Sequence, residues 1–315
     1  MRRKIIITGV AGMIGSKLLK YFLKKNFEVY GIDCKKHILV NKINNIKSKK
    51  FNYYDCDLSK EQNIKKLYNI FKENKFDSLW HLAANSDIQK GSKNTKIELN
   101  NTFLTTFNSI KLAEKLNISN FCFTSSSAIY GESNLKFKEN FGPLRPISNY
   151  GAMKASSESI IHANAKIFDK IFIFRFPNVI SSDVTHGLFF DMQKKIKKSN
   201  KINVLGNGLQ KKPYMHVDTL IKIINFLYES KKMHKTNIFN IGPDDNGITV
   251  KEIIKKFVKI KKLQNKNFTY EAKKRGWDGD VINYKFDVSK IKKILNFKIP
   301  SSIKAVEKTI KEIIL

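Results

Sequence analysis

The chain has 315 residues, of which 42% are hydrophobic and 23 are phenylalanine. This composition excludes an intrinsically disordered protein and allows a sizeable core, or two lobes. Lys and Arg total 59 against 27 Asp and Glu, a formal net charge of +32, but the lysines are scattered rather than gathered into one stripe, which favours a general compositional bias over a nucleic-acid partner.

Short β-rich apolar runs alternate with helical patterns through the first half of the chain. In chain order, strands are predicted at 4–9, 28–33, 51–58, 76–84, 120–127 and 171–176, and helices at 15–25, 61–74, 97–116 and from 150 onward. Such alternation indicates a parallel sheet with helices on both faces. We therefore expect an α/β fold, a Rossmann-type doubly wound parallel sheet.

The alternation loosens after Pro177. We expect residues 1–176 to form the doubly wound domain and residues 177–315 to form mainly a smaller C-terminal α/β lobe. Strands and helices from about 214–242 are expected to return to the first domain.

Cysteine, histidine and apolar patterns narrow the class of protein further. Cys34, Cys56 and Cys122 lie far apart without Cys-x-x-Cys spacing, and the six histidines show no ligand spacing. We therefore expect reduced thiols and no metal site.

The opening MRRKIIITGVAGMIG imitates a signal peptide, but glycines interrupt its apolar run. No stretch approaches the ~20 apolar residues of a membrane span, so a soluble, cytoplasmic protein without a membrane partner is expected.

A glycine-rich turn separates the first predicted strand from the first predicted helix. The turn contains Gly9, Gly12, Met13, Ile14 and Gly15. Glycines here let the backbone turn sharply and let a pyrophosphate approach the helix N-terminus. Asp33 ends the second strand, where a carboxylate accepts hydrogen bonds from adenosine ribose hydroxyls and repels a 2′-phosphate. The pattern predicts an NAD site in the first domain.

The turn and the segments that follow it resemble the extended short-chain dehydrogenase/reductase superfamily, and within it the NAD-dependent nucleotide-sugar epimerase/dehydratase family. The resemblance covers nearly the whole chain and is closest to proteins like UDP-glucose 4-epimerase. It implies further cofactor contacts from the "DCDL" and "HLAA" segments. These contacts are Asp57, Leu58, Leu82, Ala83 and Ala84.

The stretch SNYGAMKASSESII places Tyr150 and Lys154 four residues apart, on one face of a helix. A free Tyr has a pKa of about 10. A nearby ammonium and the positive ring of NAD⁺ would favour the phenolate. The resemblance implies catalytic roles for both residues, which would also contact the cofactor, and a third catalytic member, Ser126, chosen over Ser125 and Ser127 within FTSSSAIYG.

The resemblance also implies a nucleotide-sugar substrate. Lys212 stands where the family usually has an Arg, and Arg275 lies two residues earlier than the commonest spacing, so both depart from the family pattern. The expected substrate contacts are Ser86, Ser126, Ser127, Asn178, Lys212 and Arg275.

Reaction type is indicated by the residues that follow Ser126. Sugar 4,6-dehydratases of this superfamily carry Asp-Glu there, whereas this chain has Ser127 and Ala128. We expect NAD-dependent 4-epimerisation of a UDP-hexose, first UDP-glucose/UDP-galactose, by a homodimer. The alternatives are an epimerase of a UDP-N-acetylhexosamine or UDP-uronate, a nucleotide-sugar reductase or dehydrogenase, and a non-catalytic NAD-binding protein that senses redox state or binds RNA.

Overall fold

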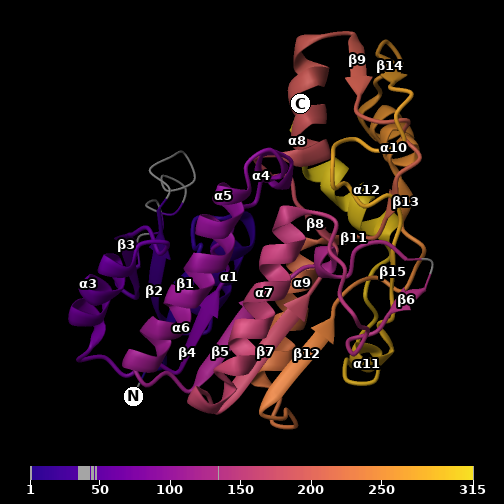
Figure 1. Ribbon diagram of the computed structural model, residues 1–315. Helices are drawn as coiled ribbons and strands as arrows, with labels where there is room; N and C mark the ends of the chain where they lie inside the picture. The colour runs from indigo at the N-terminus through magenta and orange to yellow at the C-terminus, as the bar shows by residue number, and fades with distance from the viewer. Residues whose placement is uncertain (1, 35–42, 44–45, 47, 134, 315) are drawn as a thin grey trace.

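The computed structural model describes residues 2–34, 43, 46, 48–133 and 135–314. A seven-stranded parallel sheet runs through the molecule, in the order β12-β7-β5-β4-β1-β2-β3 (Figure 1). Its strands are β1 (Lys4–Thr8), β2 (Glu28–Asp33), β3 (Phe51–Asp55), β4 (Ser78–His81), β5 (Asn120–Thr124), β7 (Lys170–Arg175) and β12 (Thr236–Asn240). The predicted fold class, a Rossmann-type parallel sheet, is confirmed.

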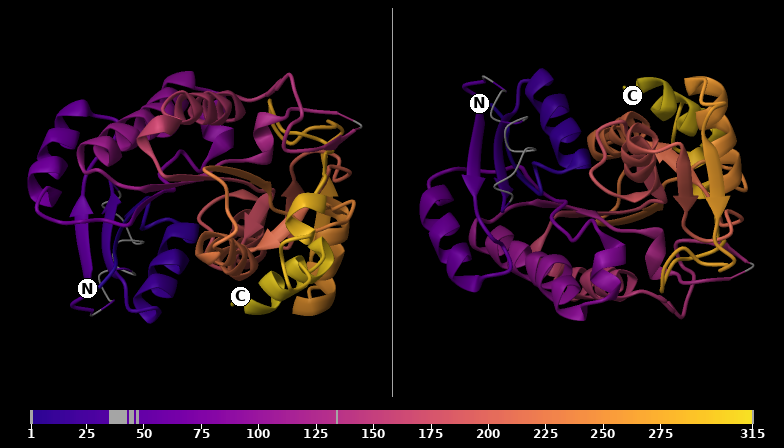
Figure 2. Two further views of the ribbon diagram at one scale, coloured as in Figure 1. Left: turned by 90° about the horizontal axis from the view of Figure 1, so that it is seen from below. Right: turned by 90° about the horizontal axis from the view of Figure 1, so that it is seen from above.

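Helices cover both faces of this sheet, as the views from below and above show (Figure 2). The main helices around the sheet are α1 (Met13–Lys24), α3 (Glu61–Phe71), α6 (Thr105–Lys115), α7 (Asn149–Ala163) and α9 (Val217–Glu229). The alternation of side chains along β1 explains the two layers: Ile5 and Ile7 pack with α1 and α9, whereas Ile6 packs with α3 and α6.

The predicted helix at 97–116 is built from three consecutive elements. They are α5 (Thr95–Glu98), the π-helical segment η1 (Leu99–Leu104) and α6. A short α4 (Ile88–Ser92) precedes them and packs against α5 and α7. Glu98 and Thr102 are buried within this segment.

A third core cluster lies in the C-terminal part of the chain, where Phe189, Phe257 and Val306 are buried together. The elements there are α8 (Gly187–Lys198), β9 (Lys201–Val204), β10 (Lys211–Lys212), β13 (Ile248–Thr249), α10 (Val250–Lys261), β14 (Asn267–Tyr270) and α12 (Ser302–Glu312). The remaining short elements are the 3-10 turns η2 (Ser127–Ile129) and η3 (Ala165–Ile167), strands β6 (Lys136–Phe137), β8 (Asn178–Ile180), β11 (Tyr214–His216) and β15 (Lys285–Phe286), and helix α11 (Ser289–Lys292). Of these, η3 packs against the core of the main sheet.

The segment 214–242 is shared between the two regions. Strand β11 pairs with β8 in a separate two-stranded sheet, α9 packs against α1, and β12 forms an edge of the main sheet beside β7. Among the described residues, no helix combines the length and the apolar character needed to cross a membrane.

Candidate active site

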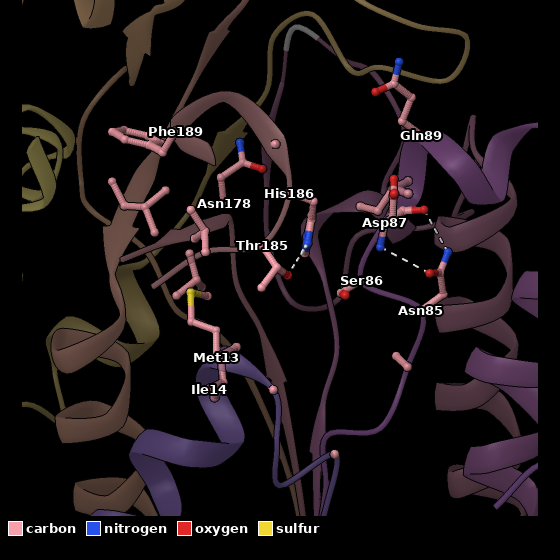
Figure 3. Close-up of a pocket in the computed structure, with 18 of the residues that line it drawn as sticks. Met13, Ile14, Asn85, Ser86, Asp87, Gln89, Asn178, Thr185, His186 and Phe189 are labelled. Atoms are coloured by element: carbon pink, nitrogen blue, oxygen red, sulfur yellow. Dashed lines mark hydrogen bonds between the residues drawn. The ribbon is translucent and has the colours of Figure 1, made fainter. Parts of the chain in front are cut away.

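A cavity of about 570 Å³ lies where the strands of the main sheet end and the C-terminal elements begin. Residues that follow β1, β2, β3 and β4 line one part of it, and residues of α8, β9 and the segment before β10 line the other. Figure 3 shows Asn85, Ser86 and Asp87 on one side of the cavity, facing Asn178 and Thr185 on the other. Ligands of open α/β sheets bind at this edge.

The glycine turn forms one wall of the cavity. Gly9 has a φ of +69°, and a Cβ there would lie 2.7 Å from the backbone nitrogen of Ala83. At Gly15, a Cβ would collide with the carbonyl oxygen of Gly9. Helix α1 begins at Met13 with no side-chain cap and no acidic residue in its first turn, so its first N–H groups and dipole favour an anion.

The carboxylate of Asp33 lies beside this turn, at the end of β2. It is 7% exposed, lines the cavity and accepts a hydrogen bond of 2.9 Å from the backbone nitrogen of Ala11. Asp57 also lines the cavity and binds the backbone and hydroxyl of Ser59. The turn, the helix N-terminus and these two acidic groups fit the pyrophosphate and adenosine of a dinucleotide.

The remaining predicted cofactor contacts follow β3 and β4. The backbone nitrogens of Leu82 and Ala83 each donate to the Thr8 hydroxyl at 3.2 Å, which holds the end of β4 against β1. The predicted contacts found in the lining are Gly9, Gly12, Met13, Ile14, Gly15, Asp33, Asp57, Leu58, Leu82, Ala83 and Ala84.

Helix α7 brings Tyr150 and Lys154 to the end of β5. The Ser148 hydroxyl caps the helix by accepting from Gly151 N at 3.1 Å, which fixes where the helix starts. Tyr150 is half-buried, whereas Lys154 is 1% exposed and donates to the carbonyl oxygen of Thr124 at 2.7 Å. Thr124 lines the cavity, while Tyr150, Lys154 and Ser126 lie next to its wall rather than among its lining residues.

Burial governs the ionisation of this pair. It raises the pKa of the Tyr150 phenol, Glu98 adds to the rise, and hydrogen bonding to the Ser126 side chain lowers it. Burial lowers the pKa of Lys154 to about 7, against the opposing effects of Glu98 and Glu158. The Lys154 ammonium is directed to the Thr124 carbonyl oxygen and lies 5.9 Å from the Tyr150 ring centroid.

The three consecutive serines after β5 have three different partners. Ser125 donates to the buried carboxylate of Glu158 at 2.5 Å. Ser126 is the hydrogen-bond partner of Tyr150 and also accepts from the backbone of Ala128. Ser127 is instead a hydrogen-bond partner of Tyr284. Since successive side chains of an extended segment point to opposite sides, only the middle serine faces Tyr150.

The predicted substrate contacts divide into two groups. Ser86, Asn178 and Lys212 line the cavity, and the Lys212 ammonium is paired with Asp280. Ser126, Ser127 and Arg275 do not line it. Arg275 forms a bidentate ion pair with Glu132, with nitrogen–oxygen distances of 2.9 and 2.7 Å, and also donates to the carbonyl oxygen of Asp280.

Several cavity residues were not among the predicted contacts. Asn85 and Asp87, which hydrogen-bond each other, could have been inferred from their position after β4. The others come from α4, α8 and loops, and no sequence pattern places these segments beside the cavity. They include Gln89, Thr185, His186, Phe189, Lys195, Gln210 and Trp277.

Within the described part of the chain, one group of side chains has the spacing of a metal site: His216, Asp218 and Glu312. The Lys308 ammonium lies 2.6 Å from Asp218 and 3.1 Å from the His216 ring, so an ion-pair cluster accounts for the arrangement. His81 is buried, and its ring contacts the hydroxyls of Thr8 and Thr106.

Comparison with known proteins identifies the family. The chain matches the NAD dependent epimerase/dehydratase family over residues 5–242. The chain belongs to this family. Its cofactor is NAD, as predicted, and the glycine turn and Asp33 are suited to hold it.

Two relatives and a solved structure show how much of the chain is shared. A UDP-glucuronate 4-epimerase of Thermodesulfobacterium geofontis is 25% identical over 95% of this chain and 92% of its own length. A dTDP-D-glucose 4,6-dehydratase of Dictyostelium discoideum is 24% identical over 82% of this chain and 62% of its own length. A UDP-glucuronic acid 4-epimerase of Bacillus cereus, solved with UDP-glucuronic acid and NAD, superposes with a TM-score of 0.84 at 23% identity over 98% of each chain.

Proposed function

We propose that the protein catalyses the NAD-dependent 4-epimerisation of a UDP-hexose. The observation that carries this proposal is the hydrogen bond between the Tyr150 phenol and the Ser126 side chain, one helical turn from Lys154. It lies at the end of β5, on the same edge of the parallel sheet as the glycine turn after β1. Such a set transfers a proton to or from a sugar hydroxyl. When bound, NAD supplies the hydride acceptance and return at C4, and its positive ring favours the Tyr150 phenolate.

Each side chain has a distinct role in this reaction. Tyr150 removes the proton of the sugar 4-hydroxyl, and Ser126 holds the oxygen that loses it. Lys154 contributes positive charge beside the phenol and contacts the cofactor ribose. The 4-keto sugar then rotates within the site and presents its opposite face. Tyr150 returns the proton to the C4 oxygen, so the product has the opposite configuration at C4 and no net oxidation occurs.

The segment after Ser126 supports epimerisation over dehydration. Eliminating water needs an acid and a base, and this chain offers Ser127, engaged with Tyr284, and the apolar Ala128. The dehydratase among the relatives shares the family's fold, but the groups that elimination chemistry requires do not occur at these positions.

Residues of the cavity lining offer groups suited to both parts of a nucleotide sugar. Asn178 and Ser86 lie near the strand ends, where the hexose would sit, and Lys212 supplies positive charge for the diphosphate. UDP-glucose and UDP-galactose are the first substrates to test. UDP-glucuronate is the second, since the relative from Thermodesulfobacterium geofontis is named for it.

The homodimer remains part of the proposal. Phe103, Phe107 and Ile160 of the helices expected at the interface are partly exposed, whereas Ile161 belongs to the core. Light scattering of the purified protein measures the mass directly, and a monomer at working concentration would contradict a dimer.

The test is to incubate the purified protein with each sugar, without added NAD, and follow the anomeric signals by proton NMR. Interconversion of the 4-epimers establishes the reaction and bound NAD together. Tyr150→Phe, which removes one oxygen atom, should lose activity by about 10²-fold or more while keeping its bound NAD. Net change in nicotinamide absorbance in excess over enzyme would indicate a reductase instead. Bound NAD without conversion of any sugar, together with salt-sensitive RNA binding, would favour the non-catalytic alternative.

A further inference from the structure

Glu98 is a buried carboxylate that the reaction outlined above does not use. Its exposed fraction is 0%. One oxygen accepts from the Asn85 amide at 2.6 Å, and the other accepts from the Thr102 hydroxyl at 2.7 Å. Burying a charged group costs free energy unless its bonds are satisfied, and here each oxygen has a donor. A buried carboxylate with a shifted pKa beside a cavity wall is a candidate for a functional role.

The surroundings of Glu98 connect the cavity wall with the start of α7. Asn85 lies in the lining and is bonded to Asp87. Gly91 of α4 packs directly on the Glu98 carboxylate, leaving no space for a Cβ. The carbonyl oxygen of Gly91 in turn accepts from the Asn149 amide at 3.4 Å, next to Tyr150. The π-helical segment η1 begins immediately after Glu98, and such segments occur often at functional sites.

Glu98 also acts electrostatically on both members of the reactive pair. Its negative charge raises the pKa of Tyr150 and that of Lys154, beside the larger effects of burial. Burial raises the pKa of Glu98 itself, although its hydrogen bonds and Lys154 oppose this.

Other charged or titratable groups near the pair come from each neighbouring element. The segment after β4 contributes Asp87, and β4 contributes His81, whose pKa is lowered by burial and by Lys154. Helix α7 contributes Glu158, whose carboxylate is bound by Arg175 of β7. Because Glu158 already has a cationic partner, Glu98 is the carboxylate whose charge falls on both Tyr150 and Lys154.

We propose that Glu98 is a positioning residue of the epimerase site, whose carboxylate sets the charge around Tyr150 and Lys154 and fixes the Asn85–Asp87 wall against the start of α7. This inference rests on the proposed function for its kinetic consequence, whereas the titration of Tyr150 can be measured without a substrate. Removing the charge lowers both pKa values in the same direction, so the whole pH range of activity moves to lower pH.

The test uses Glu98→Gln in the purified, NAD-containing protein. Glutamine preserves the shape: its oxygen still accepts from Asn85, and its amide can donate to the Thr102 hydroxyl oxygen. Glu114→Gln is the matched control, because the same chemical change is made at an exposed position of α6. Thermal unfolding of all variants checks that they fold.

Two readouts separate the possible outcomes. In the pH profile of kcat/KM, both limbs should move to lower pH in Glu98→Gln and stay in place in Glu114→Gln, with activity at the new optimum within about tenfold of wild type. In NMR spectra of isotope-labelled tyrosine, the resonance that disappears in Tyr150→Phe should titrate at lower pH in Glu98→Gln, whether or not a sugar is converted. Glu98→Asp, which retains the charge, should restore the limbs.

A folded Glu98→Gln protein whose Tyr150 resonance titrates as in wild type would overturn the proposal. A protein that converts no nucleotide sugar but shows the shifted resonance would instead contradict the proposed function and leave the charge effect of Glu98 standing. If Glu98→Gln fails to fold, Glu98→Asp is the deciding variant. An unchanged pH profile with an increased KM would support the role of Glu98 in fixing the Asn85–Asp87 wall. Unchanged kinetics would overturn that role.

Discussion

Arg175, the last residue of β7, forms a bidentate ion pair with Glu158 of α7 inside the protein, with Nε–Oε1 and Nη2–Oε2 distances of 3.0 and 2.6 Å. Both side chains are almost fully buried. Glu158 lies one helical turn after Lys154, so the pair fixes the orientation of α7 against the strand ends. The same guanidinium donates to the Tyr130 hydroxyl at 2.7 Å, which extends the network beneath the candidate site.

Breaking this pair should be costly. Arg175→Met leaves Glu158 as an uncompensated buried charge and should lower the free energy of unfolding by about 3–5 kcal/mol. Chemical denaturation at neutral pH measures the change. The double variant Arg175→Met/Glu158→Leu should recover most of the loss, because it removes both charges. A double variant as unstable as the single one would show that packing, not the unpaired charge, causes the loss.

The stability contribution of Lys154 should depend on pH in a defined direction. Its pKa is about 7 in the folded protein, against 10.5 for an ordinary Lys, so the unfolded chain binds more protons between these values. Stability therefore rises with pH across that range. The measurement compares the free energy of unfolding of the NAD-free protein with that of Lys154→Met. The difference, wild type minus variant, should increase from about pH 7 toward about pH 10. A difference that stays flat would contradict the lowered pKa.

Asp33 should control the choice of cofactor. Asp33→Asn removes the charge that repels a 2′-phosphate and weakens the acceptors for ribose hydroxyls, so affinity for NAD should fall by about tenfold while affinity for NADP rises. Calorimetric titration of the NAD-free protein with each dinucleotide measures both. Asp57→Asn, in the same cavity at the next strand, is the comparison: it should not increase NADP affinity. An unchanged ratio in Asp33→Asn would place the adenosine elsewhere.

Lys212 and Arg275 should differ in their effects on substrate. Lys212 lines the cavity, so Lys212→Met should raise KM for the nucleotide sugar by about tenfold, and Lys212→Arg should largely preserve it. Arg275 is paired with Glu132 away from the lining. Arg275→Met should change KM by less than about twofold. Steady-state kinetics with the sugar that proves to be the substrate measure both effects. Equal increases in KM for the two variants would show that the Arg275 loop moves onto the substrate.

The parts of the molecule that follow from local pattern could be predicted from the sequence. Strand–helix alternation predicted the main sheet, and the spacing of the glycines with Asp33 predicted the wall that suits the cofactor. The i,i+4 pair Tyr150 and Lys154 required no tertiary information, because a helix places such residues on one face.

Features that depend on contacts between distant segments escaped prediction. Glu98 looks like any polar residue of a helix until Asn85 is seen to bind it. The pairing of Arg275 with Glu132, which lies 143 positions away, could not be predicted from the sequence. The direction of the Lys154 ammonium depends on the backbone carbonyl oxygen of Thr124. Every residue has such a carbonyl, so the sequence does not indicate which one accepts the bond.

The position of β12 has a consequence for the order in which the protein can be made. This strand completes the sheet beside β7, yet the ribosome adds it only after α8, β9 and α9. Until then β7 presents an unpaired edge, with exposed N–H and C=O groups that can pair with another chain. A nascent chain that stalls before Thr236 therefore exposes the edge of β7 to pairing with other chains, whereas in the finished molecule β12 covers this edge.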